Sequence, residues 1–189
     1  MRVSIIVLML MASLASCARM QPVHDKYIPQ SFPRSATLYL DLPLRVNVNF
    51  FSDEKCTLGE HGTFMVYDYY GGGTVVDGYR PRYAFEGKMQ SVSIEANKPQ
   101  VINFTLEEKK IDSYKGVQMT ALCSLTYSFT PQDNHNYVAL YELKNNTCSA
   151  TILDLTQSRF RNLYVTATGL RPAARNCDIY EYYSQYRSK

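Results

Sequence analysis

Histidine, serine and acidic side chains are the groups of this sequence that could do chemistry, and their spacing does not assemble a catalytic centre. The histidines are His24, His61 and His135. None of them stands at a metal-ligand spacing such as HxxxH, and no GxSxG motif nominates a nucleophilic serine, although such sites can assemble from distant residues. The pairs Asp53/Glu54 and Glu107/Glu108 lie in expected turns, without an apolar pocket to separate their pKa values. We therefore expect no enzyme, no metal and no cofactor.

A glycine-rich segment has the composition most typical of a binding surface. Gly71-Gly72-Gly73 is not a phosphate-binding loop, because neither Gly-Lys-Ser/Thr nor a helical pattern follows it. Tyrosines and two arginines flank it, and recognition surfaces are rich in both residue types. We expect a loop that binds a protein or a glycan. Its candidate contact residues are Tyr69, Tyr70, Tyr79, Arg80 and Arg82. The alternative is that half of the tyrosines here pack in the core.

The amino-terminal residues carry the clearest motif of the chain. A basic start at Arg2 precedes an apolar run, Val3 to Ala15, which is shorter than the about 20 residues that a bilayer-spanning helix needs. This pattern is typical of a secretory leader, which is removed from the mature protein. The run ends in Leu14-Ala15-Ser16-Cys17, which resembles the lipobox of bacterial lipoproteins.

That resemblance implies cleavage before Cys17 and acylation of its thiol and amino group, which would hold the mature protein on a membrane surface. Ala18 stands where an Asp resembles an inner-membrane retention signal, which implies the outer membrane, with the domain facing the periplasm or the cell surface. A simple signal peptide cut near Ser16 and a mitochondrial-like presequence are the alternatives. The expected organisation is a leader over 1–16, the lipidated cysteine and a flexible tether over 17–36, and one domain over 37–189. An extended arm packed on the domain is the alternative to the tether.

The body of the sequence reads as short strands. Apolar residues occupy every even position from 38 to 50, an alternation that predicts a strand, with Pro43 bending or splitting it. A second, unbroken alternation runs over odd positions from 117 to 129. Further strands are expected over 63–70, 83–85, 91–95, 101–106, 137–143, 148–152 and 163–168. Hairpins are expected at 97–99, 131–136 and 145–146, and a solvated loop at 107–110.

These strands predict an all-β fold: an antiparallel β-sandwich, immunoglobulin-like or transthyretin-like, followed by a short helix. The helix is expected because four apolar residues near the carboxyl end recur at helical spacing behind a capping Asp178. They are Ile179, Tyr182, Tyr183 and Tyr186. Fraying is the alternative, because short helices are marginal alone.

The cysteines behind Cys17 predict two disulfide bonds, since an even number in an exported chain indicates bridges. Cys123 and Cys148 both fall on the inward face of their strands, so we pair them with each other, which leaves Cys56 with Cys177. The layout from Cys123 to Cys148 is similar to that of small uncharacterised bacterial lipoproteins with β-sandwich domains. It transfers no site residues.

Charge completes the functional expectation. Lys+Arg 20 against Asp+Glu 17 gives a net charge of +3, too balanced to make nucleic-acid binding the default. We expect a membrane-anchored, non-catalytic envelope lipoprotein that binds a protein or cell-wall glycan through its loops. The alternatives are an envelope hydrolase with a spatially assembled site and a transthyretin-like subunit of a secretion system.

Overall fold

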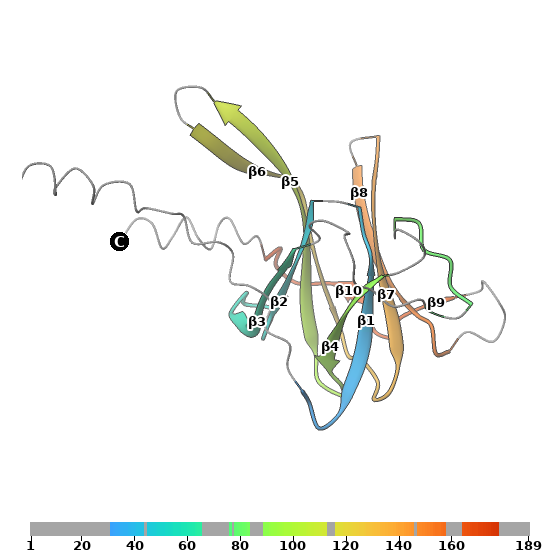
Figure 1. Cartoon of the computed structure of the whole chain (residues 1–189). Helices are drawn as coiled ribbons and strands as arrows, with labels where there is room; N and C mark the ends of the chain where they lie inside the picture. The colour runs from blue at the N-terminus through green and yellow to red at the C-terminus, as the bar shows by residue number, and fades with distance from the viewer. Residues whose placement is uncertain are drawn as a thin grey trace, which may run out of the picture.

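The computed structural model describes residues 31–43, 45–65, 76, 78–83, 89–112, 116–145, 147–157 and 164–177, without the side chains of 58–65, 107–112 and 116–122. Regular structure within these ranges consists entirely of strands, arranged in two five-stranded sheets that enclose one core, as in a β-sandwich (Figure 1). The all-β prediction is therefore confirmed. The leader, Cys17, most of the tether and the expected helix at 178–189 lie outside the described residues.

The first sheet, here the β1 sheet, has the strand order β4-β1-β7-β8-β9. Its strands are β1 (Ser35–Asp41), β4 (Gln90–Glu95), β7 (Asn136–Lys144), β8 (Thr147–Asp154) and β9 (Val165–Thr166). β1 runs parallel to β7, with Leu38 beside Tyr137, and the other pairs are antiparallel. This sheet is mixed, so the expectation of a purely antiparallel sandwich is wrong here. The sequence pattern of a strand does not reveal the direction of its neighbour.

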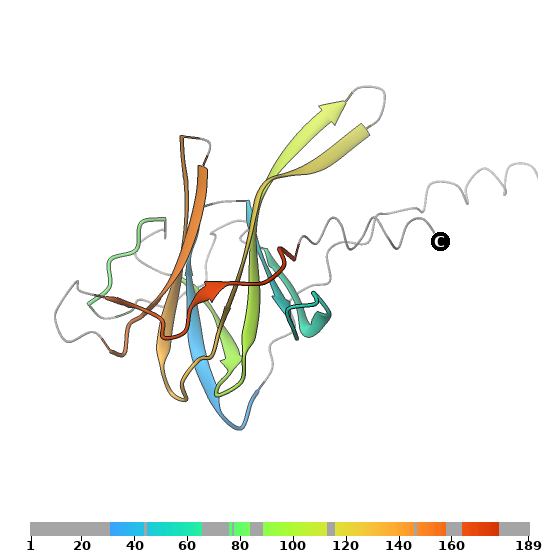
Figure 2. The same cartoon turned by 180° about the vertical axis from the view of Figure 1, so that it is seen from behind.

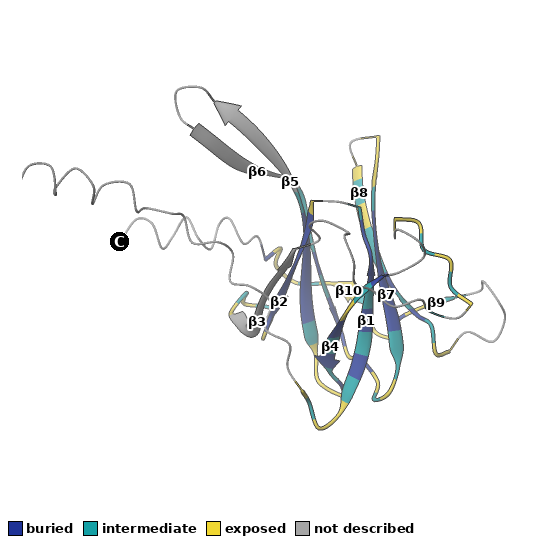
Figure 3. Cartoon of the chain, viewed as in Figure 1, coloured by how far each residue is buried: buried dark blue, intermediate teal, exposed yellow. Residues whose placement is uncertain are grey.

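The second sheet, here the β2 sheet, is antiparallel throughout, in the order β10-β6-β5-β2-β3. Its strands are β2 (Val46–Phe51), β3 (Leu58–Met65), β5 (Gln100–Asp112), β6 (Gly116–Phe129) and β10 (Arg171–Pro172). Buried residues concentrate where the two sheets face each other (Figure 3). The core thus lies between the sheets, and the loops and outer faces are left for other roles.

The split expected at Pro43 is confirmed, and the structure adds its consequence. β1 ends at Asp41, and β2 begins at Val46 in the other sheet. Leu38 and Leu40 of β1 and Val48 of β2 are all fully buried in the shared core. One alternation therefore serves two strands, because even-numbered residues face the core from both sheets. β1 starts at Ser35, two residues before the expected domain boundary at 37.

Two of the three expected hairpins are wrong. The connection at 97–99 joins β4 to β5, and the connection at 131–135 joins β6 to β7, so each links strands of different sheets. The third expected hairpin is found, since β7 and β8 pair with each other up to Lys144 and Thr147. Turn-forming residues mark a change of direction in all three places. They do not say whether the next strand joins the same sheet or the facing one.

The hairpin of β5 and β6 corrects two further expectations. Residues 107–110, expected as a solvated loop, continue strand β5 and pair with β6 as far as Asp112. Beyond Leu106 this hairpin has no third strand among the described residues, and it extends past the body of the sandwich (Figure 2). The ladder shifts register between Leu106 and Glu107, because Leu122 is an extra residue on β6. The alternation over 117–129 is therefore interrupted by a bulge.

The remaining strand predictions differ mainly in their bounds. The strand expected over 63–70 begins earlier, at Leu58, and is described only to Met65. The strand expected over 163–168 is limited to Val165–Thr166. Tyr83 lies in a bend rather than a strand, and residues 84 and 85 are outside the described ranges. Hydrogen bonds to neighbouring strands decide these bounds, and local composition does not record them.

Both disulfide pairings are found. Cys56 and Cys177 are bonded with their Cα atoms 5.2 Å apart, and Cys123 and Cys148 with theirs 6.3 Å apart. The second bond joins β6 of one sheet to β8 of the other, so it closes the sandwich at that side. The first joins the turn after β2 to the last described residue of the chain.

Candidate functional site

The loop of residues 76 and 78–83, which we call the Tyr/Arg loop, is held on the outer face of the β1 sheet chiefly by one carboxylate. Asp41, the last residue of β1, accepts hydrogen bonds from the Tyr79 hydroxyl at 2.8 Å, from the Arg82 backbone N–H at 2.8 and 3.0 Å, and from the Tyr83 N–H at 2.8 Å. Both carboxylate oxygens are used. Residues about forty positions apart in sequence are therefore fixed to one another.

The burial of Asp41 makes this attachment strong. Asp41 is 0% exposed, and a buried carboxylate is tolerated only where hydrogen bonds replace its lost hydration. Hydrogen bonds to an ionised acceptor are roughly twice as strong as neutral ones. The parity of β1 explains the position: even residues face the core, so Asp41 lies with Tyr39 on the outer face, beneath the loop.

Tyr79 anchors the loop rather than offering a contact to a partner. Burial, and then the hydrogen bond to Asp41, raise the pKa of Tyr79 well above its ordinary value of 10, so the hydroxyl stays protonated and donating. Its ring makes an edge contact with Tyr164, with centroids 5.3 Å apart, and the Tyr164 hydroxyl donates to the carbonyl of Gly78. Gly78 has a φ of +77°, a left-handed conformation that suits glycine.

The same anchoring leaves arginine and tyrosine side chains at the surface. Arg80 is exposed, Tyr83 is 42% exposed, and the exposed Arg82 guanidinium pairs with Glu142 of β7. Below them the outer face of the sheet is apolar, with Met89, Val138 and Leu140 buried. The structure therefore presents a polar, aromatic surface on a packed apolar base.

The structure describes three of the five residues predicted for this site. Arg80 and Arg82 are exposed on one loop, Tyr79 is a partly buried anchor, and Tyr69 and Tyr70 lie outside the described residues. Sequence reasoning missed Asp41, Glu142 and Tyr164. The signal for Asp41 was present: an acidic residue on the polar side of an alternating strand, just before the chain turns at Pro43.

A second polar group lies at the other end of β7. The His135 ring nitrogen Nδ1 is 2.9 Å from Oδ2 of Asp154, and the ring stacks on Tyr137 with centroids 6.0 Å apart. The other oxygen of Asp154 accepts the N–H groups of Thr156 and Gln157 at 2.9 and 3.1 Å. Within the described part of the chain, no hydroxyl or thiol is hydrogen-bonded to Nε2 of His135. This pair orders the ends of β7 and β8, and it lacks a nucleophile there.

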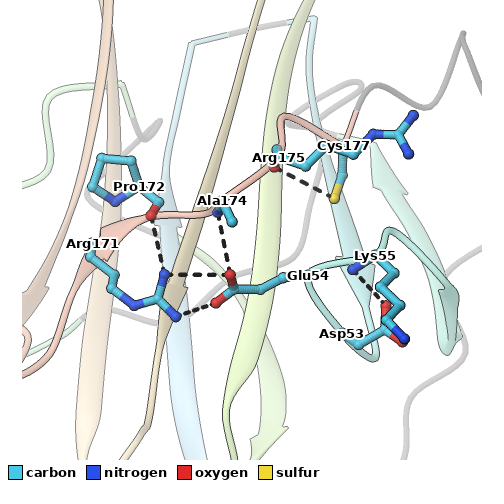
Figure 4. Close-up of polar contacts among 8 residues, drawn as sticks. All are labelled: Asp53, Glu54, Lys55, Arg171, Pro172, Ala174, Arg175 and Cys177. Atoms are coloured by element: carbon cyan, nitrogen blue, oxygen red, sulfur yellow. Dashed lines mark hydrogen bonds and ion pairs between the residues drawn. The ribbon is translucent and has the colours of Figure 1, made fainter.

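A carboxylate in the turn predicted at Asp53/Glu54 holds the segment 171–177, here called the strap. Glu54 accepts hydrogen bonds from the two terminal guanidinium nitrogens of Arg171. It also accepts one from the Ala174 N–H at 3.3 Å (Figure 4). The hydrogen bond from Arg171, and then that from Ala174, lower the pKa of Glu54 from its ordinary 4.5. Its neighbour Asp53 caps the local turn by accepting the N–H groups of Lys55 and Thr57 at 2.9 and 3.1 Å.

The strap ends on a network of small polar side chains on the outer face of the β2 sheet. Asn103, 0% exposed, donates to Ser124 and Thr126 at 2.8 and 3.0 Å and accepts from Asn49 at 3.2 Å. Thr126 donates to the Asn176 side chain and accepts the Cys177 N–H, both at 2.8 Å. These groups satisfy one another, so the network fastens strands and strap rather than offering a ligand site.

Comparison with known proteins identified no relative of the chain. No model of a known protein family matches the chain, and no curated protein matches it. Across the described ranges, no cluster of three or more His, Cys, Asp or Glu residues could hold a metal ion. No helix in the part that the structure describes is long and apolar enough to cross a bilayer.

Proposed function

We propose that this chain is a non-catalytic envelope lipoprotein that binds a protein or a cell-wall glycan through the Tyr/Arg loop. The observation that carries the proposal is the attachment of the loop to buried Asp41, which fixes the backbone while Arg80, Arg82 and Tyr83 stay exposed. Binding to a pre-ordered loop costs less conformational entropy than binding to a mobile one.

The chemistry of the exposed groups favours such partners. A guanidinium binds carboxylates in a planar, bidentate geometry, and an exposed tyrosine ring packs against apolar surfaces and sugar faces. An acyl anchor at Cys17 would confine this surface to one membrane and raise its local concentration near a partner. The two disulfides support an oxidising compartment for the domain. The same proposal includes two further features of the domain: a sandwich of the immunoglobulin-like or transthyretin-like kind, and a short helix at 178–189.

Cross-linking in intact cells tests the loop. The full chain should capture a defined partner, and the double variant Arg80→Ala/Tyr83→Ala should lose at least tenfold of that capture, because it removes the exposed groups and leaves the Asp41 anchor. Arg34→Ala is the matched control, since it removes another exposed arginine, outside the loop. Equal capture by the loop variant and the control would refute the assignment of the surface.

The anchor is tested separately. Cys17→Ser should abolish labelling by a fatty-acid analogue and release the protein from the membrane fraction, because no acceptor thiol remains. Retention of unlabelled Cys17→Ser in membranes would count against the lipid anchor without touching the loop.

The His135–Asp154 pair supports a second candidate, an envelope hydrolase that activates water or a nucleophile through Nε2. The purified full chain would then turn over ester, amide or glycoside substrates, and His135→Ala would abolish that turnover. Turnover that depends on His135 would replace the non-catalytic proposal. Its absence over a broad substrate panel leaves binding as the function.

A further inference from the structure

The disulfide bond of Cys123 with Cys148 joins the two sheets at a side of the sandwich where few strands cover it. Cys123 lies on β6 and Cys148 on β8, which belong to different sheets, so no backbone ladder connects them. Within the described ranges, β9 pairs with β8 only over its last two residues, and β10 pairs with β6 only at Tyr127 and Ser128. No described strand therefore lies beside either cysteine on this side.

The surroundings of this bond are open to small solutes. Both cysteines are half-buried, and so is Leu106, which pairs with Cys123. Leu143, directly opposite Cys148 in the ladder of β7 with β8, is 48% exposed, although Tyr141 on the same face of β7 is in the core. The hairpins β5–β6 and β7–β8 diverge at this end of the sandwich (Figures 1 and 2).

The other disulfide bond is more enclosed. Cys177 is 1% exposed, packs with Phe51 and Val101, and donates its N–H to Thr126. A thiolate that attacked Cys56 would have to expel the Cys177 sulfur as an anion into these apolar surroundings. Burial disfavours a charged group, so that sulfur is a poor leaving group. The half-buried bond on β6 and β8 does not have this barrier on either sulfur.

We propose that the Cys123–Cys148 bond is a thiol–disulfide exchange site, which a dithiol reduces while Cys56–Cys177 stays intact. A thiolate of the dithiol bonds to one sulfur, and the other sulfur leaves as a thiolate that takes up a proton. The second thiol of the dithiol then displaces the cysteine still held in the mixed disulfide. Two electrons and two protons thus pass from the dithiol, which becomes a disulfide, to Cys123 and Cys148, which become thiols.

Reduction at this site releases β8 from the facing sheet. The ladders of β6 with β5 and of β8 with β7 do not involve the bond, so each sheet keeps its own pairing. The two sheets can then separate locally at this side, which makes the partly buried apolar residues there accessible. These are Leu106, Leu125 and Ala150. The exchange site is independent of the Tyr/Arg loop and goes beyond the proposed binding function.

Timed reduction of the full chain in detergent tests the site. Dithiothreitol is the probe, and iodoacetamide labels the thiols that appear, which peptide mass spectrometry then assigns. Cys123 and Cys148 should become labelled at least tenfold faster than Cys56 and Cys177. Equal rates for the two bonds, or faster labelling of Cys56 and Cys177, would overturn the proposal.

Hydrogen exchange of the selectively reduced chain tests the release. Amide exchange over residues 147–152 of β8 should rise at least tenfold, because the bond to the facing sheet no longer holds this strand. Exchange over 46–51, in β2, should stay unchanged. No rise over 147–152, or an equal rise in both segments, would contradict a local release.

Two variants at Leu143 locate the attack without altering a cysteine. Directly opposite residues on paired strands have Cβ atoms about 5 Å apart, so a charge at this position acts on an anion that approaches Cys148. Leu143→Glu should slow reduction of Cys123–Cys148 by the dithiothreitol thiolate, and Leu143→Lys should accelerate it. The two rates should differ at least threefold and converge in added salt. Equal rates, or the same difference at Cys56–Cys177, would refute attack at this site.

Discussion

The Tyr/Arg loop and the strap each cover the outer face of one sheet, and they are fastened in different ways. The loop is held chiefly by charge-assisted hydrogen bonds to one buried carboxylate, Asp41, with further contacts to Tyr164 and Glu142. The strap is held by a disulfide at Cys177, by the ion pair of Arg171 with Glu54, and by the Asn103 network through Thr126. The attachment of the loop depends mainly on one residue, whereas that of the strap is shared among several.

This difference suits the strap to stabilising the fold and the Tyr/Arg loop to binding a partner. The bonds of the strap consume its polar groups at Asn176 and Cys177, so that little is left for a partner. In the loop, Asp41 engages mainly backbone N–H groups, so the Arg80 and Tyr83 side chains keep their binding capacity. Loops that carry function on a rigid support follow this pattern.

The largest effect is expected from opening the strap. The paired variant Cys56→Ser/Cys177→Ser removes a bridge across 121 residues, which lowers the free energy of unfolding by about 5 kcal/mol in the chain-entropy relation. Chemical denaturation measures this loss, and capture of the partner by the folded fraction should be unchanged. Cys123→Ser/Cys148→Ser spans 25 residues and should cost less, about 3.5 kcal/mol. Loss of capture in the folded strap variant would erase the distinction between the two regions.

A smaller effect on stability, but a larger one on binding, is expected from the loop anchor. Asp41→Asn replaces an acceptor oxygen by an NH2 group that faces N–H donors, which should cost about 3 kcal/mol and lower partner capture at least tenfold. Denaturation and limited proteolysis within 76–83 check it. Asp133→Asn is the control, since that side chain accepts one N–H, from Ser35 at 3.1 Å. Normal capture by Asp41→Asn would show that the loop needs no anchor.

The smallest effect is expected on how the stability of the domain depends on pH in the acid range. Because the folded pKa of Glu54 is below 4.5, the stabilisation from its ion pair is complete above that pH and disappears as the pH falls through the lowered value. Melting curves of the parent chain and Glu54→Gln should therefore differ near neutral pH and converge in acid. Added salt should also narrow the difference, since Arg171 is exposed. A difference that grows in acid would contradict the ion pair.

The sequence predicted the features that depend on the alternation of residues along one strand. It missed those that depend on which strands pair with each other. Alternation placed Leu38, Val48, Cys123 and Cys148 toward the core, and that parity also selected the disulfides. Pro43 marked the break between β1 and β2, but the change of sheet was not predicted, because the same parity faces the core in both sheets. The bulge at Leu122 is likewise not visible in the sequence, since it is defined only by the pairing of β6 with β5.

The candidate site shows the same limit. The composition of the Tyr/Arg loop was readable, but Asp41 lies 38 residues before Tyr79 and 41 before Arg82. Only the folded sheet brings that carboxylate beneath the loop. The role of Glu54 was missed for a related reason, because its partner Arg171 is 117 residues away. Pairings over such separations carry no local signature.

β1, the first described strand, enters its sheet between β4 and β7 rather than at an edge. A mechanical load applied through the preceding residues would act along β1 and stress both of its ladders in shear, so that many hydrogen bonds must yield together. Peeling a strand from an edge breaks them one at a time. From this position of β1 we expect the domain to resist tension applied from its amino-terminal side, and the rate of forced unfolding would measure that resistance.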